Sequence, residues 1–165
     1  MKILLVNKYF NMHGGSETYF FGLADLLRQA GHEVIFFAMQ DEKNLPCEQS
    51  AYFVSNVEFN GELTAAQKLK AAFRMVYSFE AKKKISALIE KEKPDIIHIN
   101  LFHRVLTASI VDAAKKHGIP VVFTMHDLNC VCPNHVMLDH GKICEACLHG
   151  NYSVSYTHLR AHETS

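Results

Sequence analysis

The sequence predicts an α/β fold of the doubly wound, mainly parallel, Rossmann-like type. Short apolar runs of strand length alternate with segments of helical periodicity along the chain. The chain has 165 residues, 48% of them hydrophobic, which is enough for one compact domain with a core. Because strands that alternate with helices connect through right-handed crossovers, this order predicts a parallel sheet covered by helices.

The first three elements follow from apolar spacing. A continuous apolar run at 2–6 predicts a strand buried on both faces. Helical periodicity then extends over 16–30, and Gly31 is a good C-terminal stop. The run HEVIFFAM at 32–39 predicts a second buried strand, and a weaker third strand is expected at 51–54.

The second half of the pattern repeats the alternation. A helical stretch at 64–93 is expected to divide into two helices near Tyr77 and Ser78 and to stop at Pro94. The run DIIHIN at 95–100 predicts a strand, 105–118 predicts a helix closed by its final glycine, and PVVFTMH at 120–126 predicts another strand.

Ligands of doubly wound sheets bind at the carboxyl ends of the strands, so the residues found there are the candidates for a site. They are Asn7 with the turn HGGSE after the first strand, Asn100 and His103 after the strand at 95–100, and His126 with Asp127 after the last strand. His98 lies inside a strand and is expected to be a core histidine with satisfied hydrogen bonds.

The paired glycines of the turn, Gly14 and Gly15, have two interpretations. A loop can need positive φ before a helix, and Ser16 can serve as the N-cap. Alternatively, glycines without a Cβ let a phosphate or sugar approach the backbone, while the N–H groups and helix dipole at Ser16 and Glu17 favour an anion. The turn is neither a G-x-G-x-x-G fingerprint nor a P-loop, so NAD binding and ATP hydrolysis lose support.

His126 and Asp127 form the strongest catalytic candidate. A histidine held just past a buried strand can donate a hydrogen bond to a sugar hydroxyl or transfer protons near neutral pH. The alternative is that both residues simply cap a loop. No G-x-S-x-G elbow is present in the sequence, so nucleophilic hydrolysis is unsupported.

Four cysteines form two close pairs, Cys130 with Cys132 and Cys144 with Cys147. Four thiols so spaced can build a structural zinc site, provided that a turn at 139–142 brings the pairs together. The alternative is a loop of small buried thiols that bind nothing. No leader or spanning segment is apparent, so reduced thiols and a cytoplasmic location are expected.

Charge is balanced over the chain, with 17 basic and 17 acidic residues, which gives no argument for nucleic acid. The charge is unevenly distributed, since the segment 64–94 contains eight basic residues and only three acidic ones. Such a stretch is usually a solvated face. Peripheral contact with the inner face of a membrane through 64–93, or a regulatory partner bound there, are the alternatives.

The end of the chain differs from the rest. Residues 153–165, SVSYTHLRAHETS, lack the apolar periodicity of a helix or a strand and are similar to translated adapter sequence. We therefore expect a native domain at 1–152 and a non-native tail at 153–165, with the natural continuation of the protein lost.

Taken in order, the segments HGGSE, LLRQAGHEVIFFA, KPDIIHIN, HGIPVVFTMHD, CVCPN and GKICEAC resemble the N-terminal domain of GT-B-fold glycosyltransferases of family 4. The resemblance covers residues 1 to about 152. Members of this family build capsule, exopolysaccharide and lipopolysaccharide chains. Cys132, Cys144 and Cys147 match cysteines that recur in some members, whereas Cys130 is an addition.

The resemblance implies a retaining transferase that moves a sugar from a nucleotide-diphosphate donor to a saccharide or lipid-linked acceptor, without a metal in catalysis. It implies that this domain holds the acceptor, that Gly14 and Gly15 contact the donor's diphosphate or sugar, and that His126 contacts the transferred sugar. The donor-binding domain, with its paired glutamates, is absent from this sequence, so the chain alone is expected to be inactive. A non-catalytic sugar- or nucleotide-binding module remains the alternative.

Overall fold

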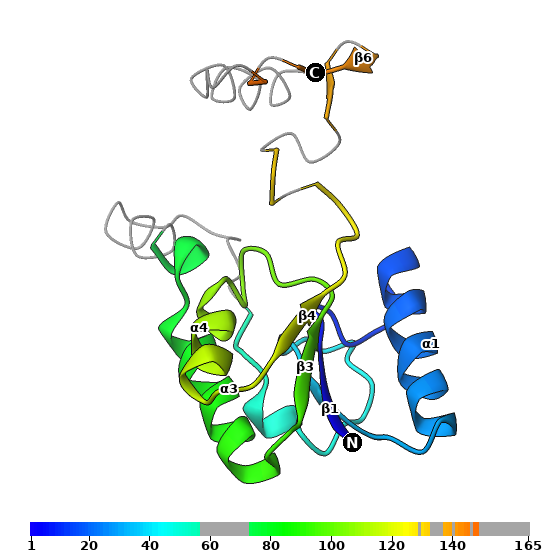
Figure 1. Cartoon of the computed structure of the whole chain (residues 1–165), viewed down its shortest axis with the longest axis vertical. Helices are drawn as coiled ribbons and strands as arrows, with labels where there is room; N and C mark the ends of the chain where they lie inside the picture. Colours follow the sequence, from blue (N-terminus) through cyan, green and yellow to red (C-terminus); the bar gives the residue numbers. More distant parts are fainter. Residues whose placement is uncertain (57–72, 129, 133–136, 140, 146, 149–165) are drawn as a thin grey trace. The chain divides into compact units, whose positions relative to one another are not determined.

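The computed structural model describes residues 1–56, 73–128, 130–132, 137–139, 141–145 and 147–148 (Figure 1). The chain divides into two compact units, Met1–Thr124 and Met125–Ser165, and each is described by itself. The predicted tail at 153–165 and the first part of the basic stretch, 64–72, lie outside the described residues.

The first unit is built on a four-stranded parallel sheet with the order β2-β1-β3-β4. Its strands are β1 (Lys2–Val6), β2 (Glu33–Phe37), β3 (Ile96–Ile99) and β4 (Val121–Phe123). The chain runs outward from β1 to β2, then returns to the other side of β1 for β3 and β4. This reversal confirms the predicted doubly wound, Rossmann-like α/β fold.

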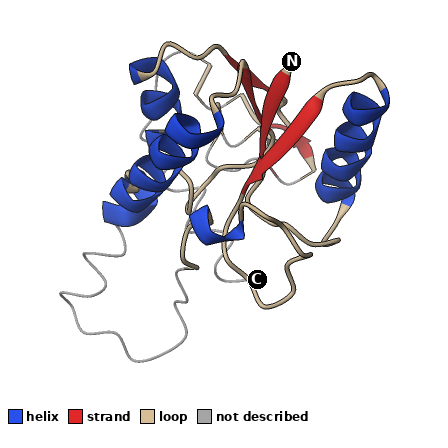
Figure 2. Ribbon diagram, turned by 90° about the horizontal axis from the view of Figure 1, so that it is seen from below, coloured by secondary structure: helices blue, strands red, loops and turns tan. Residues whose placement is uncertain are grey.

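Helix α1 (Gly15–Gln29) covers one face of the sheet (Figure 2). Phe20 and Ala24 face inward from it and are almost completely buried. Phe20 packs with Phe10 and Phe36, at ring-centroid distances of 6.3 and 5.7 Å. We call the buried residues on this side of the sheet the α1-side core, and they are Ile3, Leu5, Phe10, Phe20, Ala24, Val34, Phe36, Ala38 and Phe53.

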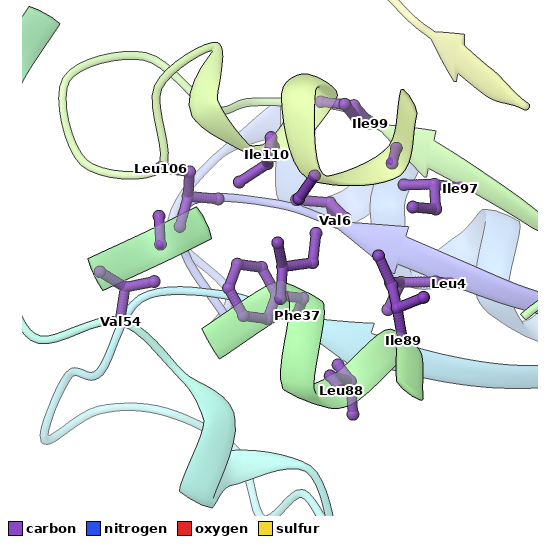
Figure 3. Packing of buried hydrophobic residues seen from close by; sticks show 14 of the residues in the cluster. Leu4, Val6, Phe37, Val54, Leu88, Ile89, Ile97, Ile99, Leu106 and Ile110 are labelled. Atoms are coloured by element: carbon purple, nitrogen blue, oxygen red, sulfur yellow. The ribbon is translucent and has the colours of Figure 1, made fainter. Parts of the chain in front are cut away.

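The opposite face is covered by α3 (Phe79–Glu92) and α4 (Ser109–Lys116). Alternate residues of β1, Leu4 and Val6, point into this second core, as period-two alternation in a strand requires (Figure 3). Leu88 from α3 and Ile110 from α4 pack against them with no more than 1% of their surface exposed. The central strand β1 is therefore buried on both faces, which explains why it is a continuous apolar run.

The predicted break at Tyr77 and Ser78 is confirmed. Residues 73–76 are helical, and α3 then begins at Phe79 with Ser78 as its N-cap. The Ser78 hydroxyl accepts a hydrogen bond from the Ala81 N–H at 3.2 Å. The buried hydroxyl of Thr107 accepts from the Ser78 N–H at 3.0 Å, which ties this helix start to the segment before α4.

Three predicted elements are wrong in part. The strand predicted at 120–126 is β4, which ends at Phe123, so His126 is not part of the strand. At 51–54 the chain forms a 3₁₀ turn, η1 (Ser50–Tyr52), followed by a single parallel bridge between Val54 and Met39. The helix predicted at 105–118 begins only at Ser109, because Thr107 adopts a φ of 58° and interrupts the helical backbone. Apolar spacing before Thr107 reflects burial of Val105 and Leu106 in a turn.

A charged group connects α3 to the segment before it. Burial alone would raise the pKa of the Glu80 carboxyl, but hydrogen bonds from the Ser55 hydroxyl and N–H, together with nearby Lys84 and Arg74, outweigh it and lower that pKa. The Glu80 side chain is only 29% exposed. The group therefore holds the start of α3 against Ser55, which follows the bridge at Val54.

The second unit contains a small antiparallel hairpin of β5 (Leu138–Asp139) and β6 (Lys142–Ile143). Gly141 has a φ of 77°, a conformation that a side chain would strain. The turn predicted at 139–142 is thus confirmed.

Candidate functional site

The candidate site of the first unit lies where β1 and β3 end side by side. These adjacent strands connect to opposite edges of the sheet, and this switch point is where doubly wound sheets bind ligands. Asn7 follows β1 and Asn100 follows β3, and both side chains are fully buried. The Asn100 N–H donates to the Val6 carbonyl at 2.8 Å, so the two strand ends are held together.

Helix α1 begins at Gly15, one residue earlier than expected. Gly14 is the N-cap and Gly15 the first helical residue, so the prediction that Ser16 caps the helix is wrong. Gly14 has an extended backbone with a φ of −167°, and neither glycine has a positive φ. A Cβ added to Gly15 would meet no atom within 4 Å, and one added to Gly14 would meet only Glu17 Oε2 at 3.6 Å. The fold itself therefore does not require a glycine at either position.

Glu17 turns inward from the first turn of α1. Its side chain is 1% exposed. Its Oε1 accepts a hydrogen bond from Asn7 Nδ2 at 3.0 Å, and its Oε2 accepts one from the Ser16 hydroxyl at 3.0 Å. The carboxylate thus faces the interior of the chain, and the expectation that Glu17 belongs to a ligand-facing helix end is wrong for its side chain.

The loop after β3 carries the next two candidates. Asn100 begins it, and His103 is partly buried with its ring tilted against Phe102 at 4.4 Å between centroids. Arg104 and Thr107, farther along the loop, have φ values of 71° and 58°. Left-handed backbone at two side-chain-bearing residues gives this loop a fixed, unusual path. Asn100 and His103 follow β3, the glycine turn follows β1, and the structure shows that these two strands are adjacent in the sheet.

His126 and Asp127 belong to the second unit, where both are partly buried. Their predicted juxtaposition with the glycine turn remains a prediction. His98, expected to be a core histidine, is partly buried on β3, and its Nε2 lies 2.7 Å from Thr124 Oγ1. This contact joins the end of β4 to β3.

The structure does not support the predicted zinc site. Cys130, Cys132, Cys144 and Cys147 are all free thiols, with Cys132 buried and Cys130 exposed. Among the described residues, no three histidine, cysteine or acidic side chains gather closely enough to hold a metal ion. The hairpin turn forms as expected, but the two cysteine pairs do not gather around one point.

A group that was not predicted from the sequence lies between β1 and the two glycines. The rings of Tyr9 and His13 stack at 4.6 Å between centroids, and the Lys8 ammonium lies 4.6 Å from the centroid of Tyr9. Aromatic and cationic residues directly after a central strand are a signal that could have identified this group. It places basic side chains on the same loop as the two glycines.

Comparisons with known proteins give a family and two matching solved structures. The model of Glycosyltransferase Family 4 matches residues 13–142. MurG from Acinetobacter baumannii is 19% identical with a TM-score of 0.49, and the match covers 76% of this chain and 35% of that one. The glycosyltransferase VinC, solved in complex with DTDP, is 20% identical with a TM-score of 0.49, and the match covers 82% of this chain and 38% of that one. No curated protein matches.

The family match begins at His13, the first residue of the HGGSE turn, and continues through β2, β3 and β4 to the hairpin of the second unit. It therefore includes the glycine turn, the loop after β3, and the pair His126 and Asp127. Because the match extends over most of its length, the chain belongs to Glycosyltransferase Family 4.

Proposed function

We propose that the protein transfers a sugar from a nucleotide-diphosphate sugar to a saccharide or lipid-linked acceptor, with retention of anomeric configuration, in bacterial cell-surface polysaccharide synthesis. The observation that carries this proposal is the family match over the glycine turn at the carboxyl end of the central strand. In this proposal the present chain is the acceptor-side domain of a hexosyltransferase, and a second domain supplies the donor site.

The glycine turn has the properties that such a site needs. Because neither its backbone angles nor its packing demands a glycine, the open space at Gly15 is free for a ligand to approach the backbone. Gly14, Gly15 and Ser16 would contact the sugar or the diphosphate of the donor. Asn100 and His103, on the neighbouring loop, would orient hydroxyl groups of the bound sugar.

His126 and Asp127 carry the proposed chemistry. His126 would donate a hydrogen bond to the transferred sugar and stabilise the charge that develops in the transition state, with Asp127 beside it in the sequence. In this role the histidine orients the sugar and makes no nucleophilic attack. No metal is required for such a step, and the nucleotide sugar is a substrate.

A transfer assay tests this proposal. The longer natural protein, with the continuation that the family resemblance implies, is incubated with nucleotide sugars and saccharide or lipid-linked acceptors, and the product linkage is read by NMR. We expect transfer with a retained anomeric configuration, and no transfer by the 165-residue chain. Transfer by the 165-residue chain alone would contradict its assignment as half of a site. Binding of nucleotide sugar by the longer protein without turnover would instead favour a non-catalytic sugar- or nucleotide-binding module.

We also propose that the protein works in the cytoplasm and contacts the inner face of a membrane through the basic stretch at 64–93. An exposed apolar patch in the described part of that stretch supports this. Phe73, Val76 and Phe79 are 68%, 77% and 78% exposed and line one pocket of about 520 Å³. Lys83 is exposed nearby on α3. Aromatic and aliphatic side chains beside lysines suit the interface of an anionic bilayer.

In the part of the chain that the structure describes, no helix combines the length and the apolar character needed to cross a membrane.

Vesicle flotation tests the membrane proposal. We expect the chain to float with anionic vesicles more than with neutral ones, and Phe79→Ser to reduce flotation. Lys83→Glu should weaken binding to anionic vesicles about fivefold or more, since a lysine near such a surface contributes about 1 kcal/mol. Leu26→Ser is the matched control, because Leu26 is 64% exposed on α1, away from the basic stretch. Equal, low flotation with both kinds of vesicle would end the proposal.

A further inference from the structure

The Asn7 side chain uses all of its hydrogen-bonding groups within the chain. Its Nδ2 donates to the Tyr9 carbonyl at 2.8 Å and to Glu17 Oε1 at 3.0 Å. Its Oδ1 accepts from the Leu101 N–H at 3.1 Å. Because two acceptors face the nitrogen and one donor faces the oxygen, the orientation of the amide is defined and an aspartate cannot replace it.

The partner of Asn7, Glu17, is a carboxylate buried in the first turn of α1. An acidic group at a helix N-terminus is stabilised by the helix dipole, which offsets part of the cost of its burial. Its two oxygens accept from different residues, Asn7 and Ser16. The carboxylate therefore links the glycine turn to the end of β1, and Asn7 links both to the loop after β3.

We propose that Asn7 and Glu17 form a buried clamp that sets the position of the glycine turn relative to the loop after β3. These two segments carry all candidate ligand contacts of the first unit, namely Gly14, Gly15, Ser16, Asn100 and His103. Asn7 and Glu17 are then positioning residues that act through their neighbours and touch no ligand. The clamp itself stands on the described contacts, and only the identity of the ligand rests on the proposed function.

Isosteric substitutions separate the clamp from simple packing. Asn7→Asp keeps the shape and the acceptor for Leu101 but removes both donors and sets a second carboxylate against Glu17. Glu17→Ala removes both links. Glu17→Gln keeps a carbonyl for Asn7, and its amide can donate to the Ser16 hydroxyl, which can turn to accept. We expect Asn7→Asp and Glu17→Ala to open the clamp and Glu17→Gln to preserve it.

Amide hydrogen exchange of the 165-residue chain, followed by NMR, measures this directly. The Leu101 N–H reports on the clamp, and the Ile97 N–H, which donates to the Pro120 carbonyl at 3.0 Å, reports on the sheet. Opening of the clamp displaces Asn7 Oδ1, or its aspartate counterpart, from the Leu101 N–H. Weakening of that one hydrogen bond predicts an increase of about tenfold in Leu101 exchange for Asn7→Asp and Glu17→Ala. The Gly15 amide resonance should shift in the same two variants. Glu17→Gln should restore both signals, and Asp25→Asn, on the exposed face of α1, should leave them unchanged.

Two results would overturn the proposal. One is an equal increase at Leu101 and Ile97, which would make the pair a general stabilising contact. The other is an unchanged Leu101 amide in folded Asn7→Asp and Glu17→Ala, or an unchanged Gly15 resonance in Ser16→Ala. If Asn7→Asp or Glu17→Ala fails to fold, Ser16→Ala removes only one link of Glu17, and it should move the Gly15 resonance while leaving Leu101 protected. These readouts involve no substrate, so failure of the transferase proposal would leave them intact.

In the longer protein, the clamp predicts that Glu17→Ala lowers kcat/KM for sugar transfer and that Glu17→Gln keeps it near the value of the unmodified enzyme. All variants are assayed at one temperature at which each of them is folded. Equal activity of Glu17→Ala and the unmodified enzyme would show that the clamp does not position ligand contacts.

Discussion

Replacing Phe20 with alanine is expected to lower the free energy of unfolding by about 3–5 kcal/mol. Phe20 is fully buried under α1, and its ring contacts Phe10, Phe21 and Phe36 at centroid distances of 6.3, 5.2 and 5.7 Å. Truncation removes the apolar surface of the ring and leaves a cavity that neighbouring aromatic rings cannot fill without shifting. A loss of this size is a large part of the roughly 5–15 kcal/mol that stabilises a typical domain.

Urea denaturation of the unmodified chain and the variant, followed by circular dichroism, measures the change. Leu26→Ala is the matched control, since Leu26 lies on the same helix with 64% of its surface exposed. It should cost no more than about 0.5 kcal/mol. A loss below about 1 kcal/mol for Phe20→Ala would mean that the α1-side core is packed more loosely than the described contacts indicate.

The largest effect on activity is expected at His126. If this histidine donates a hydrogen bond to the transferred sugar in the transition state, His126→Ala in the longer protein should lower kcat by about 100- to 1,000-fold. The expectation rests on the proposed function and on the position of His126 inside the family match. A donor that acts mainly in the transition state affects kcat more than KM.

Steady-state kinetics of the same transfer reaction would measure the effect, with the melting temperature of each variant recorded alongside. His32→Ala is a suitable control, because His32 directly precedes β2 at the amino ends of the strands, the end opposite to the candidate site. A kcat for His126→Ala within about threefold of the unmodified enzyme would remove His126 from the proposed chemistry.

Elements that depend on continuous or periodic apolar residues could be predicted well from the sequence. The strand β1 occupies the expected residues 2–6, and α1 begins and ends one residue earlier than expected. A strand covered on both faces is apolar at every position, and a helix that packs on the sheet is apolar at helical spacing. Both patterns can be recognised in the sequence. The break before α3 was predictable for a different reason, since Ser78 is a strong N-cap residue.

Short apolar segments were predicted less well. The run AYFV at 51–54 has strand-like composition, yet Phe53 and Val54 are buried in the cores on opposite faces of the sheet from a turn and a single bridge. A short apolar run signals burial, and its length does not distinguish a strand from a turn that passes the edge of a sheet. The start of α4 was predicted too early for the same reason, because Val105 and Leu106 are buried in a turn before the helix.

The residues of the candidate site were predictable, but their roles were not. Position at a strand end identified the glycine turn, Asn100 and His103. The inward orientation of Glu17 depends on Asn7 and, through it, on Leu101, which follows Asn7 by 94 residues in the sequence. A contact over that separation leaves no local pattern, so the sequence alone presented Glu17 as another polar residue of the turn.

The two cores also differ in how far along the chain their members lie. The buried residues of the α1-side core all lie within the first 53 residues, whereas the core on the other face includes residues as far along as Ala114. Since a chain is synthesised from its N-terminus, all partners on the α1 side are present when Leu4 and Val6 still lack those from α3 and α4. The face of β1 that carries Leu4 and Val6 therefore stays exposed while the ribosome adds about 60 more residues. During synthesis it is this apolar face that can aggregate with other chains.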